Sequence, residues 1–169
     1  IDSVSGDVAV VGAPSDASID SVSVDLRLTI NSRNVDVESV SGDIDLRGRL
    51  DGEISVETVS GQIDIAGHES SLRNLSGSSV SGDMTITTAL ASGGEISLET
   101  VSGDVELRLP ASLSANVHGE SFSGDLELPD AKVDHARHGP GSSVRHRYGN
   151  GDGEISIETF SGDARLRLD

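Results

Sequence analysis

The chain has 169 residues, of which two are Phe, one is Tyr and none is Trp or Cys. So few aromatic residues predict a thin, aliphatic core, and the lack of Cys excludes disulfides and thiolate metal sites. The formal net charge of −17 makes nucleic acid and anionic membrane surfaces poor partners, which leaves cations and cationic partners. No apolar run approaches the roughly 18 residues that span a bilayer, so we expect no membrane insertion by this segment.

A four-residue motif, Val-Ser-Gly-Asp, recurs from one end of the chain to the other. Its copies, some of them altered, begin at Val4, Val22, Val40, Val59, Val80, Val101, Phe122 and Phe160. The step is 18 residues from Val4 to Val22, 21 from Val101 to Phe122, and 38 from Phe122 to Phe160. A period near 20 residues is typical of stacked repeat architectures.

Apolar and polar residues alternate on both sides of each motif. Residues 53–57 before the fourth copy and residues 62–65 after it show this pattern, which predicts a strand, a tight turn and a second strand. We therefore expect an all-β fold: a single-stranded parallel β-solenoid of about eight rungs, forming one domain over residues 1–169. Parallel crossovers favour right-handed coiling. Alternate Val, Ile and Leu residues would fill the interior, and Gly would allow the sharp corner.

Four departures from the repeat stand out in chain order. Val24 replaces the corner Gly of the second copy, which leaves the geometry of that corner open. The Ser-rich segment 66–79 predicts a loop. The segment 129–152 is an insertion. After it, residues 144–148 and 154–158 flank the turn-rich residues 149–153 and predict a hairpin, which would form a C-terminal hairpin or cap of the stack.

One column of acids closes the motif in almost every repeat. Its members are Asp7, Asp25, Asp43, Asp83, Asp104, Asp125 and Asp163, with Gln62 in the remaining place. We interpret the column as structural, with each carboxylate accepting backbone N–H bonds at its turn. A calcium-binding module resembling a β-roll is the alternative. Gln62 would interrupt such a row of sites, so we assign no metal and no cofactor.

Two further columns of acids point outward on either side of the corner. The first comprises Glu38, Glu57, Glu99, Glu120 and Glu158; the second comprises Asp45, Asp64, Glu106 and Glu127, with Arg47 and Arg108 nearby. A solvated face is the ordinary explanation of such columns. They could also hold a cationic peptide.

The insertion carries a basic cluster on an otherwise acidic chain. Its members are His135, Arg137, His138, Arg145, His146, Arg147 and Tyr148. We consider three roles: folding onto the acidic body as a cap, binding a partner, and binding a transition metal. For partner binding, these seven residues are the candidate ligand-binding residues.

The sequence contains no isolated set of acid, base and nucleophile, and Gly-x-Ser-x-Gly is absent. Carbohydrate-cleaving β-helices use unique rather than repeated acids, so we expect no catalytic residues and no enzyme. A carbohydrate-binding or carbohydrate-active β-helix remains an alternative.

The repeated Val-Ser-Gly-Asp, with Glu-Thr before it (57–58, 99–100) and Leu-Pro after it (109–110, 128–129), resembles the bacterial DUF4097 family of adhesin-like β-repeat proteins. That resemblance implies a β-solenoid at the cell envelope, exported to the periplasm or cell surface or tethered to the membrane, often in settings of envelope stress. It carries no catalytic residues. Because the chain starts at Ile1 inside a repeat, we expect any signal peptide or anchor to lie upstream.

Taken together, these features predict a non-catalytic binding or scaffold module of the envelope. Its partner would be a protein, peptide or glycan at the cell surface. The ends of the stack could also associate with those of another copy.

Overall fold

The computed structural model describes residues 1–135 and 141–169, without the side chains of residues 68–70 and 135. Its strands are β1 (Asp2–Ser5), β2 (Val8–Gly12), β3 (Asp16–Ser23), β4 (Leu26–Ile30), β5 (Ser32–Ser41), β6 (Ile44–Gly48), β7 (Leu50–Ser60), β8 (Ile63–Ser81), β9 (Met84–Ser102), β10 (Val105–Leu109), β11 (Ala115–Ser123), β12 (Leu126–Glu127), β13 (Val133–His135), β14 (Ser142–Tyr148), β15 (Gly153–Ser161) and β16 (Ala164–Leu168). Within this part of the chain, no helix is long and apolar enough to cross a membrane.

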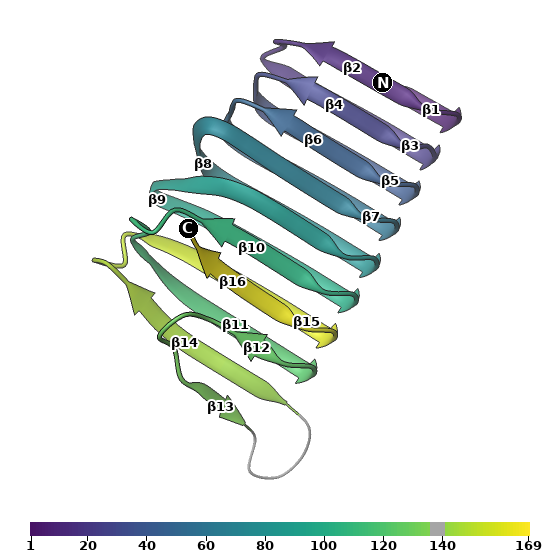
Figure 1. Ribbon diagram of the computed structural model, residues 1–169. Helices are drawn as coiled ribbons and strands as arrows, with labels where there is room; N and C mark the ends of the chain where they lie inside the picture. The colour runs from purple at the N-terminus through teal and green to yellow at the C-terminus, as the bar shows by residue number, and fades with distance from the viewer. Residues whose placement is uncertain (136–140) are drawn as a thin grey trace.

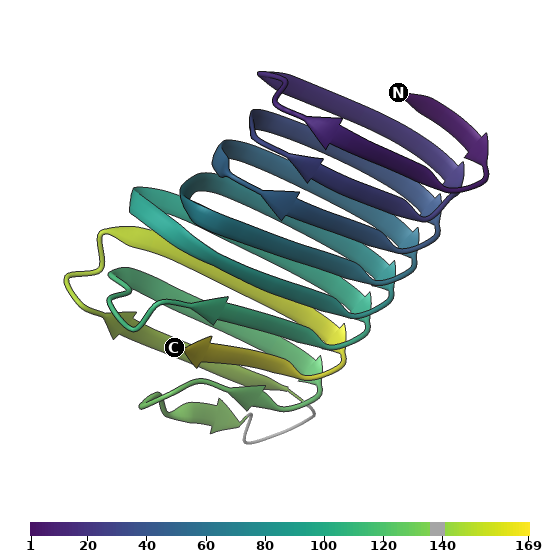
Figure 2. The same ribbon diagram turned by 45° about the horizontal axis from the view of Figure 1, so that its top comes forward.

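The strands stack into two columns that meet along one edge, where the Val-Ser-Gly-Asp motifs turn the chain (Figures 1 and 2). The long column runs β1-β3-β5-β7-β8-β9-β15-β11-β14-β13. The short column runs β2-β4-β6-β8-β9-β10-β16-β12, so the long, bent strands β8 and β9 belong to both. All neighbours are parallel except at the β14 and β13 end. The fold is therefore the predicted all-β parallel β-solenoid.

The last repeat does not occupy the end of the stack. β15 pairs with β9 on one side and with β11 on the other, and β16 lies between β10 and β12. The C-terminal rung is thus inserted between two rungs that precede it in the chain, as the yellow strands of Figure 1 show.

The predicted hairpin of residues 144–148 with 154–158 is wrong, because β11 lies between β14 and β15. The turn-rich link between these strands crosses over the start of β11, where Ser114 holds it. Ser114 Oγ lies 2.9 Å from Asp152 Oδ2, and the Gly153 N–H donates to the Ser114 carbonyl at 3.0 Å. The stack is capped instead by an antiparallel pair, β13 and β14, which the insertion itself forms.

The core is a set of aliphatic columns between the two sheets. Alternate residues of each strand point inward, so that Val56, Leu98 and Ile157 are at most 1% exposed. The segment 66–79, predicted as a loop, is part of the continuous strand β8. The prediction failed because Leu72 and Leu75 still reach the core, where they are 0% and 2% exposed, and their burial outweighs the Ser-rich composition.

The corner requires Gly for a steric reason. At Gly82 φ is +150°, and a Cβ there would lie 1.9 Å from the carbonyl oxygen of Gly61 in the preceding rung. The same contact recurs at Gly61 and Gly103 with φ of +134° and +146°. Val24, the exception, does not have a positive φ, and its side chain is 2% exposed. The second corner therefore turns its side chain into the core instead of using Gly.

Candidate functional site

The column of corner aspartates ties adjacent rungs together. Its side-chain oxygens accept backbone N–H bonds from the equivalent residue of the next rung: Asp43 to Asp25 at 3.1 Å, and Gln62 to Asp43, Asp104 to Asp83, Asp163 to Asp104 and Asp125 to Asp163, each at 2.9 Å. Asp7 belongs to the first rung of this column. These carboxylates join rungs rather than facing a shared open site. No group of three or more His, Asp or Glu residues in the described part of the chain could hold a metal ion.

The basic cluster of the insertion is divided between two faces. Arg145 and Arg147 are exposed on the outer face of β14, whereas Tyr148 is buried and His146 is half-buried with their rings 4.6 Å apart. The Tyr148 hydroxyl donates to the Pro129 carbonyl, and burial, with a smaller contribution from the charge of Asp130, raises the pKa of Tyr148. The described members of the cluster therefore do not converge on one site.

The rest of that cluster cannot be placed: Arg137, His138 and the side chain of His135 lie outside the described residues. Arg145, in contrast, connects to the body of the solenoid. Its Nε donates to His118 Nδ1 at 3.2 Å, and His118 Nε2 lies 3.1 Å from Glu120 Oε1. This chain of contacts requires the Nε2–H tautomer of a neutral His118. It joins the cap to the end of the outward Glu column.

Two exposed columns run side by side along the corner edge, and we call the surface they form the seam. The acidic column comprises Glu38, Glu57, Glu99, Glu158 and Glu120, with Ser78 in the rung between Glu57 and Glu99. The apolar column comprises Val4, Val22, Val40, Val59, Val80, Val101, Phe160 and Phe122. The apolar residues from Val22 onward are each about half exposed, from 48% to 56%. An apolar stripe that repeats on every rung is unusual for a solvent-facing surface.

The exposure of the apolar column was missed in the sequence, although a signal for it was present. In the alternating pattern Val56 points inward and Glu57 outward, so Val59 has the same parity as Glu57. Reading Val59 only as the first letter of a turn motif hid this relation. The phase of the strand predicts that every motif begins with an outward apolar side chain.

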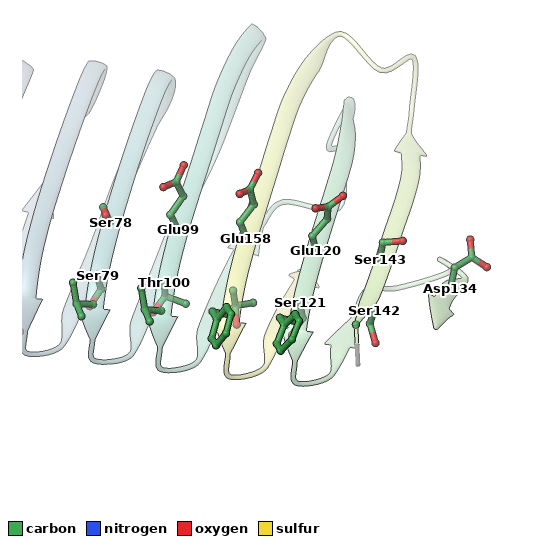
Figure 3. A pocket seen from close by; sticks show the side chains of 16 residues that line it. Ser78, Ser79, Glu99, Thr100, Glu120, Ser121, Asp134, Ser142, Ser143 and Glu158 are labelled. Atoms are coloured by element: carbon green, nitrogen blue, oxygen red, sulfur yellow. The ribbon is translucent and has the colours of Figure 1, made fainter. Parts of the chain in front are cut away.

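Toward the capped end, the seam becomes a groove of about 610 Å³ that crosses β8, β9, β15 and β11. Glu99, Glu158 and Glu120 project to the same side from three neighbouring strands, and Asp134 of β13 lies beyond them (Figure 3). Their neighbours in the apolar column, Phe160 and Phe122, stack with ring centroids 4.7 Å apart and an angle of 6°.

Below this groove lies a column of inward-facing hydroxyl residues. Ser79, Thr100 and Ser121 line the groove and are only 3% to 5% exposed. Their hydroxyl oxygens are buried and have no hydrogen-bond partner among the described residues. Unpaired buried hydroxyl groups are uncommon, because losing water without gaining a partner costs free energy.

Ion pairing of the acidic side chains differs between the outer faces of the two columns of strands. On the short column, arginines pair with the acids: Arg47 with Asp45 at 2.7 Å, Arg108 and Arg167 with Glu106 at 2.7 and 3.1 Å, and Arg165 with Glu127 and Asp163 at 3.0 and 3.3 Å. The hydrogen bond from Arg108 lowers the pKa of Glu106. Among the described acids of the seam, none has an ion pair, and Glu120 accepts a hydrogen bond from the neutral His118. The seam is therefore an acidic surface that no ion pair within the described residues compensates.

Comparison with known proteins identifies the family but no individual counterpart. No curated protein and no solved structure matches the chain. The family model described as Toastrack DUF4097 matches twice, over residues 1–95 and 90–167, and so covers nearly the whole solenoid. The stacked strands and the repeated corner motif are consistent with that match. The chain belongs to the Toastrack DUF4097 family.

Proposed function

We propose that the protein is a non-catalytic binding module of the bacterial envelope, which holds a cationic partner on the outer face of its long column. The placement in the envelope rests on the motif resemblance described above. The single observation that carries the binding role is the contrast in ion pairing: arginines pair with Asp45, Glu106 and Glu127 of the short column, while Glu99 and Glu158 have no ion pair among the described residues.

Repulsion along the acidic column supports this proposal. Neighbouring rungs are about 4.8 Å apart, so adjacent carboxylates repel by on the order of 1 kcal/mol in water before screening. The chain retains this repulsion although the contacts within the fold do not relieve it. A cationic partner relieves it on binding, which makes the arrangement favourable in the complex.

The periodicity of the acids supports a non-catalytic role. Catalytic pairs of carboxylates depend on two unlike environments that separate their pKa values. Here Glu57, Glu99 and Glu158 occupy equivalent positions of the repeat, with Ser78 in the rung between Glu57 and Glu99. A row of equivalent charges suits electrostatic binding over an extended surface.

A fluorescein-labelled decalysine peptide tests the proposal through fluorescence anisotropy. The intact chain should bind it at low salt, and affinity should fall as NaCl increases. Replacing Glu38, Glu57, Glu99 and Glu158 together by Gln should weaken binding at least tenfold.

The matched control removes the same number of acids from the short column: Asp45→Asn, Asp64→Asn, Glu106→Gln and Glu127→Gln. It should change the affinity by less than about threefold. Absence of decalysine binding, or an equal loss in both variants, would refute the proposed function.

A further inference from the structure

The groove at the capped end of the seam combines features that a merely cationic ligand would not use. Phe160 and Phe122 expose 56% and 49% of their surface directly beside the Glu158 and Glu120 positions. Six other rungs have Val at the same corner position. An exposed, stacked aromatic pair next to carboxylates fits a ligand that is cationic on one side and apolar on the other.

We propose that this groove binds a basic amphipathic helix of a partner protein, lying along the stacking axis between β9 and the cap. This inference rests on the proposed function and specifies the partner for that same surface. The apolar face of the helix covers Val101, Phe160 and Phe122. Its Lys or Arg residues reach Glu99, Glu158 and Glu120.

The spacing of the rungs favours a helix over an extended peptide along this axis. Side chains on one face of a helix recur about every 5.4 Å, close to the roughly 4.8 Å between rungs. From Glu99 to Glu120, two rungs apart, the mismatch is only about 1 Å, which long Lys side chains absorb. Same-face side chains of an extended strand recur about every 6.8 Å, so the mismatch grows to about 4 Å.

The cap defines where the helix ends. Asp134 of β13 and Ser143 of β14 line the groove beyond Glu120, as Figure 3 shows. The dipole of a helix makes its N-terminus partly positive. A helix whose N-terminus lies at the cap therefore directs this end toward the Asp134 carboxylate, and the groove thereby favours one direction of the helix.

The probe is an 18-residue helical peptide with a Leu face and a Lys flank, labelled with fluorescein, and its control is a rearranged peptide of the same composition with no apolar face. Binding to the full chain is measured by anisotropy. The amphipathic peptide should bind at least tenfold more tightly than the rearranged one.

Two double variants locate the site. Phe122→Ser with Phe160→Ser should weaken binding of the amphipathic peptide about tenfold, as expected for truncated anchor residues. Val22→Ser with Val40→Ser changes the same column at the opposite end and should alter affinity less than twofold. Because Val occupies the other six corners, Phe122→Val with Phe160→Val keeps a native corner residue and should still weaken binding, by a smaller factor.

The outcomes separate this inference from the proposed function. Equal binding of the two peptides would overturn the inference, and so would equal losses of affinity in the Phe122→Ser/Phe160→Ser and Val22→Ser/Val40→Ser variants. In either case, binding of decalysine would still support the proposed function. Failure of both the amphipathic peptide and decalysine to bind would overturn both.

Discussion

The corner of this solenoid presents two kinds of repeated column, and the contacts within the chain explain only one of them. The Gly column is fixed by the carbonyl of the preceding rung, and the Asp column accepts backbone N–H groups from the next. The Glu column, interrupted only at Ser78, and the apolar column of the seam also repeat, yet within the described residues no contact that recurs from rung to rung holds their side chains apart from the Phe122–Phe160 stack. The repetition of a residue type along the corner therefore has two origins. Contacts between stacked rungs account for the Gly and Asp columns, and we infer that binding of a partner accounts for the Glu and apolar columns.

The strongest test of the structural side is Gly82→Ala. The new Cβ would lie 1.9 Å from the Gly61 carbonyl oxygen at a φ of +150°. Backbone strain and steric overlap should lower the free energy of unfolding by about 3 kcal/mol. Urea unfolding followed by circular dichroism measures this loss. Ser81→Ala, at the exposed neighbouring position, should cost less than about 0.5 kcal/mol, and equal losses for the two variants would break the steric account.

Removing an acid of the Asp column should lower the free energy of unfolding more than removing an acid of the seam, although by less than the Gly82 substitution does. Asp104 Oδ1 accepts the backbone N–H of Asp163 at 2.9 Å, so Asp104→Ala should lower the free energy of unfolding by about 1 kcal/mol. Asp104→Asn retains an acceptor oxygen and should recover part of this loss.

Glu99→Ala is the matched change in the seam, where no ion pair or hydrogen bond to a described residue is lost. It should leave stability unchanged, or raise it slightly at low salt by relieving repulsion. Thermal melts of the three variants in low and high salt provide the measurement. A loss for Glu99→Ala as large as that for Asp104→Ala would remove the distinction between the two kinds of column.

The smallest expected effect is on the pH dependence of stability, and it comes from the ion pairs on the outer face of the short column. The hydrogen bond from Arg108 lowers the pKa of Glu106 in the folded chain below its ordinary value of 4.5. Its stabilisation is therefore fully present above the ordinary pKa and is lost as pH falls through the lowered one. Because the pair is partly exposed, its contribution is at most about 0.5 kcal/mol.

Glu106→Gln should accordingly reduce the loss of stability between about pH 5 and pH 3. Urea unfolding of the variant and the wild type across this range gives the comparison. If the two curves remain parallel over the whole range, the ion pair with Arg108 does not stabilise the fold.

The fold class could be predicted from the sequence because each rung repeats the same alternation and the same corner. The order of the rungs could not, because the repeats that begin at Val101, Phe122 and Phe160 have nearly interchangeable strands and turns. The register of β9 with β15 matches Ile96 with Ile155 and Glu99 with Glu158. Phe122 and Phe160, which stack in the structure, begin consecutive repeats and would be neighbours in either order of the last two rungs.

The candidate site was only partly predictable. The alternating pattern predicted the outward Glu column. The candidate ligand-binding residues, however, were assigned to the basic cluster of the insertion, whose described members face two directions. Arg145 and His146 are consecutive residues of one strand and therefore point to opposite faces, and the pairing with β11 sets which of them points outward. The groove itself depends on the inserted rung, which places Glu158 and Phe160 between Glu99 and Glu120.

The most direct test of the seam as a binding surface is a titration of the ¹⁵N-labelled full chain with the amphipathic peptide, followed by two-dimensional NMR. The account predicts that the largest amide shifts cluster at residues 99–101, 120–122 and 158–160, with little change at residues 43–47 and 104–108. Largest shifts on the short column, or shifts spread evenly over all rungs, would contradict it.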